Sequence, residues 1–144
     1  MITTIIIFIA VLAVLVLVHE IGHFVTARWF GCGVEELGLG FPPRLYGFKS
    51  AKTNIVYSIN AIPLGGFVKI KGEDGADRAD PTSFGAKPAW QRAIILIAGV
   101  TMNVILAAVL LMIGFGVGLP TALPDDPPLL AHAQVRDVAT AIYQ

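Results

Sequence analysis

Cysteine and net charge are both scarce in this 144-residue sequence. Cys32 is the single cysteine, so no disulfide can form within the chain, and its place between two glycines favours a small buried side chain. Ten basic and ten acidic residues give a formal net charge of zero. The chain therefore lacks the basic excess that would point to nucleic acid as a partner.

The sequence contains two long apolar runs that have no charged residue. Hydrophobic residues make up 56% of the chain, whereas soluble domains contain about 45–50%. Residues 2–18 and 93–119 carry no charged side chain, and a membrane-spanning helix needs about 20 mostly apolar residues. We predict transmembrane helices over 2–30 and 93–119. A cleaved signal peptide fits the first run poorly, because a basic start and a small-residue cleavage site are both missing.

The basic residues predict how these helices cross the bilayer. Nine of the ten lie between Arg28 and Arg92, and a tryptophan stands close to each of these two arginines, as interfacial anchors do. The positive-inside rule places residues 31–92 in the cytoplasm and both termini outside. Residues 120–144 begin with four prolines in nine residues, and we expect an extracytoplasmic linker there.

The 31–92 segment carries strand signals. "TNIVYSIN" alternates with period two, "AIPLGG" has turn chemistry, and "FVKI" is a second short β-prone run. "VEELGLGF" and "RLYGFK" are further strand candidates, and "KGEDGADRADPTS" is an expected exposed loop. The predicted fold is membrane α-helical with a small β-hairpin or sheet insertion: two transmembrane helices flank a cytoplasmic, membrane-associated β-rich loop.

The sequence "HEIGH", residues 19–23, places ionisable groups inside the first predicted membrane helix. His19 and His23 are four residues apart, so both imidazoles project from one helix face and can reach a single Zn²⁺. Glu20 is one step around the helix, where it can take a proton from an attacking water and return it to the leaving amine.

Another interpretation treats the two histidines as polar groups that a neighbouring helix satisfies. A charged side chain near the centre of a membrane helix costs roughly 2.5–3.5 kcal/mol on insertion scales. Three adjacent ionisable groups therefore need mutual compensation, which a metal ion supplies. We favour the zinc interpretation for that reason.

Four segments together resemble the N-terminal part of the site-2 protease family of intramembrane zinc metalloproteases, in the family's order. They are "VLVHEIGHFVTARWFG", "GLGFPPRLYGFK", "SINAIPLGGFVKIKGED" and "FGAKPAWQRAIILIAGVTMN". The resemblance implies zinc ligation by His19 and His23, with Glu20 as general base. It further implies a multi-pass protein of a bacterial inner membrane that cleaves single-span membrane proteins near the cytoplasmic boundary.

The resemblance suggests substrate-binding roles for three more residues. Gly65 and Gly66 match a family hairpin that presents its edge to an unwound substrate, as strand addition allows; a plain hairpin turn is the alternative. Asn103 also matches, and either contacts substrate, orients the site or bonds a neighbouring helix. The family often has Gly-Pro where this chain has Gly99-Val100, so the proline that would kink the helix is missing here.

The sequence offers no convincing third ligand for a catalytic zinc, which normally has three protein ligands and water. His132 falls on the opposite side of the membrane in the predicted topology. In the family the third ligand is an aspartate before glycine in a later membrane helix, which Asp74-Gly75 matches only superficially. Six carboxylates occupy loop sequence: Glu35, Glu36, Glu73, Asp74, Asp77 and Asp80.

We therefore expect an N-terminal fragment of a longer protease, inactive by itself, with no PDZ domain in these residues. One alternative is a catalytically incomplete membrane scaffold or zinc-binding remnant. Another is a soluble zinc protease behind a signal peptide.

Overall fold

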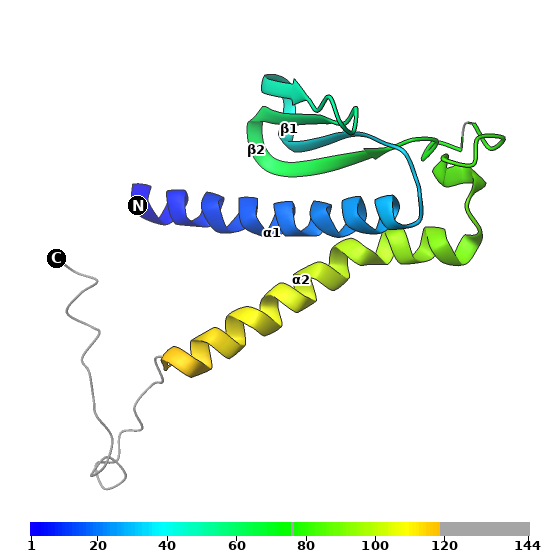
Figure 1. Ribbon diagram of the computed structural model, residues 1–144. Helices are drawn as coiled ribbons and strands as arrows, with labels where there is room; N and C mark the ends of the chain where they lie inside the picture. The colour runs from blue at the N-terminus through cyan, green and yellow to red at the C-terminus, as the bar shows by residue number, and fades with distance from the viewer. Residues whose placement is uncertain (76, 119–144) are drawn as a thin grey trace, which may run out of the picture. The chain divides into compact units, whose positions relative to one another are not determined.

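The computed structural model describes residues 1–75 and 77–118 (Figure 1). Its elements are α1 (Ile2–Trp29), β1 (Val34–Lys49), β2 (Val56–Ile70), the 3₁₀ helix η1 (Phe84–Ala86) and α2 (Ala89–Val117). Residues 1–112 form one compact unit, and of the second unit only the end of α2 and residue 118 are described. The expected linker at 120–144, with His132, lies outside the described residues.

Both long helices follow from the apolar runs. α1 has 28 residues and α2 has 29, and each is long and apolar enough to cross a membrane. α1 ends because Gly31 adopts a left-handed conformation, φ 72°. Gly31 N–H then donates to Arg28 O and Cys32 N–H donates to Ala27 O, the paired bonds of a Schellman motif.

α2 begins earlier than its apolar run. The Pro88 carbonyl accepts hydrogen bonds from Gln91 N–H and Arg92 N–H, so the helix includes polar residues that precede the run expected at 93–119. It continues without a break through Gly99 and Val100 to Val117.

The β-rich segment is one two-stranded antiparallel sheet made of long strands. The first half of β1 pairs with the end of β2, as in Leu39↔Gly66, and also with its beginning, as in Leu37↔Tyr57. The second half of β1 pairs with the beginning of β2. The first half of β1 therefore lies between the two halves of β2, and among the described residues nothing pairs with the outer side of Gly66–Ile70.

Both segments that were further strand candidates, "VEELGLGF" and "RLYGFK", lie in β1. The segment "AIPLGG", where a turn is predicted, lies inside β2, and the chain reverses direction there. The pairs Leu37↔Tyr57 and Leu39↔Ile59 run parallel, whereas Leu37↔Val68 and Leu39↔Gly66 run antiparallel. Gly65 and Gly66 have no positive φ angle. They instead allow close packing: a Cβ on Gly65 would overlap the Phe41 ring, and a Cβ on Gly66 would lie 2.9 Å from Val16 Cγ1.

In the first part of β2, polar side chains are buried and an apolar side chain is exposed, the reverse of the usual pattern in a water-soluble sheet. Ser58 and Asn60 are buried, whereas Ile59 between them is 52% exposed. The Ser58 hydroxyl and the Arg44 guanidinium each donate to the Glu36 carboxylate at 2.6 Å, and Asn60 Nδ2 donates to Gly40 O at 3.0 Å. Internal bonds satisfy the polar side chains, and apolar ones face outward, a pattern that suits an apolar medium.

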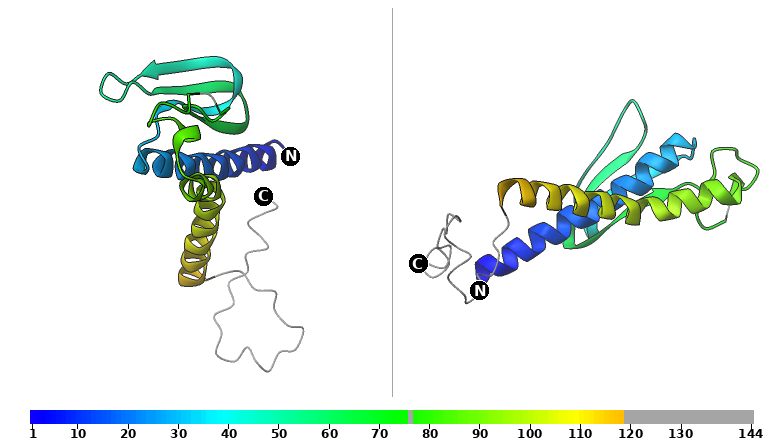
Figure 2. Two further views of the ribbon diagram at one scale, coloured as in Figure 1. Left: turned by 90° about the vertical axis from the view of Figure 1, so that its right-hand side faces the viewer. Right: turned by 90° about the horizontal axis from the view of Figure 1, so that it is seen from below.

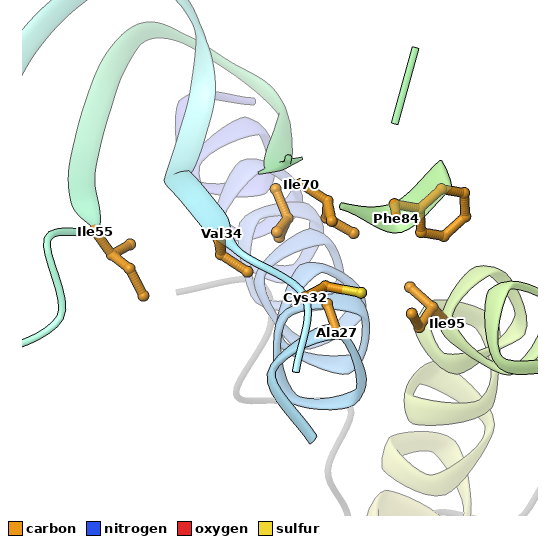
Figure 3. Close-up of a cluster of buried hydrophobic side chains, with 8 residues drawn as sticks. Ala27, Cys32, Val34, Ile55, Ile70, Phe84 and Ile95 are labelled. Atoms are coloured by element: carbon orange, nitrogen blue, oxygen red, sulfur yellow. The ribbon is translucent and has the colours of Figure 1, made fainter. Parts of the chain in front are cut away.

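α1 lies between the sheet on one side and α2 on the other, as two views show (Figures 1 and 2). A buried cluster ties the C-terminal end of α1 to both neighbours (Figure 3). Cys32 is in this cluster, and burial raises the pKa of its thiol, so it stays protonated and unreactive. The cluster consists of Ala27, Cys32, Val34, Ile55, Val68, Ile70, Phe84 and Ile95.

Candidate metal centre

His19 and His23 point their Nε2 atoms at one another. The two nitrogens are 3.1 Å apart, and the rings meet edge to face with centroids 4.8 Å apart. α1 produces this arrangement because side chains four residues apart stack on one face. The pair therefore offers two nitrogens to one point in space.

A backbone carbonyl of α2 determines which ring nitrogen of His23 carries the proton. Its Nδ1 lies 2.7 Å from the Ile95 carbonyl oxygen. Only a protonated Nδ1 can donate to a carbonyl, so in the neutral ring Nε2 carries a free lone pair. Residue 99, one turn after Ile95, is glycine, and the absence of a side chain there leaves the Ile95 carbonyl accessible to a group from α1.

Gly99 also makes room for the two imidazoles. A Cβ at this position would overlap Nε2 of both His19 and His23. The same helix crossing brings Gly22 against α2, where a Cβ would lie 2.5 Å from the Ala98 carbonyl oxygen. Small residues thus let the helices approach until the histidine pair lies against bare backbone.

These residues fit zinc. Two nitrogens that each bind a tetrahedral Zn²⁺ at ~2.0–2.1 Å lie about 3.3 Å apart, close to the 3.1 Å observed. Within residues 1–75 and 77–118, no group of three or more His, Cys, Asp or Glu side chains could hold a metal ion. The described part of the chain therefore offers two nitrogens that could bind one zinc ion.

Glu20 is positioned between the histidines and the sheet. Its carboxylate accepts a hydrogen bond from the Val68 backbone N–H, which belongs to the outer edge of β2. A Cβ on Gly66 would lie 3.1 Å from Glu20 Cγ, so the glycine allows this strand to approach α1. Glu20 and His23 line a common cavity of about 250 Å³ with Gly66, Phe67 and Val68.

The carboxylate therefore lies where it can exchange a proton with a molecule in that cavity. An extended peptide in the cavity would run beside the outer edge of β2.

Asn103 lies next to His19. Its Nδ2 is 3.4 Å from His19 Nδ1, and its Oδ1 is buried without a hydrogen-bond partner among the described residues. Asn103 was expected to contact substrate, to orient the site or to bond a neighbouring helix. Its position next to His19 favours the second role.

Two of the six carboxylates expected in loop sequence, Glu35 and Glu36, lie in β1 instead. Glu35 pairs with Lys69 at 2.8 Å, Glu36 pairs with Arg44, and Asp80 pairs with Lys71. Lys71 and Thr82 hold the pKa of Asp80 well below its usual range. Glu73 differs, because it lines the cavity that contains Glu20 and His23.

Three features of the centre were not predicted: the packing of Gly99 on the histidines, the Val68 bond to Glu20, and the place of Glu73. The only sequence signal was the spacing of Gly99 and Asn103, which puts both on one face of a helix. Nothing in the sequence pairs that face with the histidine face of α1.

The sequence and the geometry agree with the similarity of this chain to known proteins. Residues 7–142 match the family model "Peptidase family M50". Relatives from Clostridium acetobutylicum, Thermotoga maritima and Fusobacterium nucleatum each carry the name "Putative zinc metalloprotease". The first is 47% identical over 78% of this chain, the second 37% over 94%, and the third 40% over 76%.

The matched regions cover 34%, 28% and 32% of these relatives, so the chain spans about a third of their length. The match to the family model extends over most of the chain and includes the whole histidine motif. The predicted resemblance of this chain to site-2 proteases is thereby confirmed, and the chain belongs to peptidase family M50.

Proposed function

We propose that this chain supplies two zinc ligands and the general base of an intramembrane metalloendopeptidase of the site-2 protease type. Its substrates would be transmembrane segments of single-span proteins. The observation that carries the proposal is the His19–His23 pair, 3.1 Å apart between Nε2 atoms, beside a cavity that Glu20 shares with the outer edge of β2. The names of the relatives support zinc as the cofactor.

Each residue has a distinct part in the proposed reaction. Zn²⁺, when bound, would polarise the scissile carbonyl and make water a better nucleophile at neutral pH. His19 and His23 would hold it through Nε2. Glu20 would take the proton of the attacking water and deliver it to the leaving amine.

The strand edge would hold the substrate. Main-chain hydrogen bonds to Gly66–Ile70 would keep a peptide extended, and an extended peptide is what a protease needs in order to reach the carbonyl. Gly65 and Gly66 would contribute by keeping the strand close to its neighbours rather than by direct contact. Non-helical backbone at membrane depth is tolerated where protein or a wet cavity lines it.

We propose further that the third ligand is an aspartate in a later membrane helix, as the resemblance implies. Among the described residues, His19 and His23 offer two nitrogens to a metal ion, and no group of three or more His, Cys, Asp or Glu side chains could hold one. A non-catalytic scaffold or zinc-binding remnant is the alternative, and no observation favours it over the protease, because Glu20 already lines a cavity beside the histidine pair.

The experiment is to purify residues 1–144 in detergent, titrate zinc and assay cleavage of a model transmembrane peptide. We expect weak binding and no cleavage, because water must complete the shell and no second helix fixes the ion; a misplacement of ~1 Å can cost ~10²-fold. Zinc binding should disappear in a His19→Ala, His23→Ala double variant, and persistence there contradicts the proposed site. Tight one-to-one zinc with turnover would place the third ligand within this chain, with Glu73 the first residue to mutate.

The predicted membrane topology also has a direct test. Cysteine introduced by Lys71→Cys should be protected from an impermeant maleimide in intact cells, and cysteine introduced by Gln134→Cys should be labelled, because the basic loop is cytoplasmic. Cys32 is 3% exposed and should give no background. Labelling at position 71 from outside would overturn both the topology and the exclusion of His132.

A further inference from the structure

We propose that Asn103 is a positioning residue for the metal. Its side-chain oxygen accepts a hydrogen bond from Nδ1–H of His19 and holds that ring in the tautomer whose Nε2 binds Zn²⁺. This inference rests on the proposed zinc-dependent function and extends the centre to a polar residue of α2.

The first observation is an unmet hydrogen-bonding requirement. Asn103 Oδ1 is buried without a partner among the described residues, although buried polar atoms are almost always paired. The other amide atom, Nδ2, is 3.4 Å from His19 Nδ1. A half-turn of the planar amide exchanges Oδ1 and Nδ2 with almost no change in shape. It aims the oxygen at the imidazole nitrogen and puts Nδ2 in the former place of the oxygen.

The second observation is the regular spacing of the contacts between the helices. His23 and His19 are four residues apart in α1, while Ile95, Gly99 and Asn103 are spaced by four in α2. His23 meets the Ile95 carbonyl, both rings meet Gly99, and His19 meets Asn103. Each histidine therefore has one partner on Nδ1, and the two Nε2 atoms converge between those partners.

His19 needs such a partner because a neutral imidazole carries one proton. When that proton is on Nδ1, Nε2 has the lone pair that a metal requires; when it is on Nε2, that nitrogen cannot bind. A backbone carbonyl enforces the first tautomer on His23. An amide oxygen would do the same for His19, as outer-shell acceptors do for metal-bound histidines.

A substrate contact fits the position of Asn103 less well. The cavity shared by Glu20 and His23 is lined by β2, Glu73 and the Ile95–Leu96 part of α2, and Asn103 is not among its lining residues.

The test is zinc affinity of the 144-residue chain in detergent, measured by competition with a chromophoric chelator. Asn103→Leu, which keeps the approximate size and removes the acceptor, should weaken Zn²⁺ binding by about 10–100-fold, the usual effect of losing an outer-shell partner. Asn103→Asp keeps an acceptor oxygen and should restore affinity to near that of the unmodified chain. Helix content by circular dichroism checks that each variant folds.

A second readout reports the tautomer of His19 directly. In the zinc-bound chain labelled with ¹⁵N-histidine, the His19 resonances should show a protonated Nδ1. Asn103→Leu should remove this preference at His19 and leave His23, which bonds to Ile95, unchanged.

Unaltered zinc affinity in Asn103→Leu, or an unprotonated Nδ1 at His19 in the zinc-bound chain, overturns the inference. Failure of Asn103→Asp to restore affinity would also contradict it. If the unmodified chain bound no zinc through His19 and His23, the proposed function itself would fail and this inference with it. If the chain binds zinc through His19 and His23 with an affinity that does not change when Asn103 is substituted, only this inference fails and the proposed function stands.

Discussion

Glu20→Gln should abolish proteolysis while zinc binding persists. In a form of the protein that carries a complete zinc shell, we expect peptide cleavage to fall by about 10²–10⁴-fold, the usual loss on removing a positioned general base. Glutamine has nearly the same shape, and its amide oxygen can still accept the Val68 N–H bond that now holds the carboxylate. The change therefore removes proton transfer and little else.

Zinc titration of the 144-residue chain with Glu20→Gln shows whether Glu20 is a general base or a zinc ligand. Affinity equal to that of the unmodified chain is expected, because the proposed metal-binding nitrogens belong to His19 and His23. Glu35→Gln is a suitable control, since it removes a half-exposed carboxylate that pairs with Lys69, and it should leave both cleavage and zinc intact. Loss of zinc in Glu20→Gln would mean that Glu20 is a ligand and that its assigned role is wrong.

Gly99→Ala should have the largest effect on metal binding. The added methyl would overlap Nε2 of both histidines, so the rings must separate or the helices must move apart. We expect zinc affinity to fall by more than the ~10–100-fold that follows loss of an outer-shell partner, because both ligands are displaced. Chelator competition on the purified chain measures this.

Gly116→Ala provides the matched control in the same helix. A Cβ there meets no atom within 4 Å among the described residues, so zinc affinity should not change. Equal affinities for Gly99→Ala and Gly116→Ala would show that the helix crossing does not shape the metal centre.

The sequence predicts the helices and the chemical pair well, and for local reasons. Apolar run length determines both α1 and α2, and the four-residue spacing of the histidines determines their common face. These features depend on residues close together in the chain. The motif could therefore be interpreted without knowledge of what packs against it.

The sheet was predicted less completely. Pro63, Gly65 and Gly66 are typical of turns, and β2 reverses direction there. The sequence does not show that the two glycines also permit Phe41 and α1 to approach closely. Such close packing involves partners that are distant in sequence. The alternation of "TNIVYSIN" predicts a strand, but the sequence does not say which side chains are buried, and in the part of this segment within β2 they are Ser58 and Asn60.

The supporting contacts of the metal centre could not be derived for the same reason. Ile95, Gly99 and Asn103 meet the histidines across more than 70 residues of sequence. Their role depends on the helix crossing, which small residues such as Gly22 permit but do not specify.

Zinc X-ray absorption spectroscopy of the purified chain tests the central claim most directly. At millimolar protein with substoichiometric zinc, even a weak site fills, and the spectrum reports the ligands. The account predicts two imidazole nitrogens per zinc at ~2.0–2.1 Å, with the imidazole signal absent in the His19→Ala, His23→Ala variant. A spectrum with no histidine ligands, or one unchanged in that variant, would contradict it.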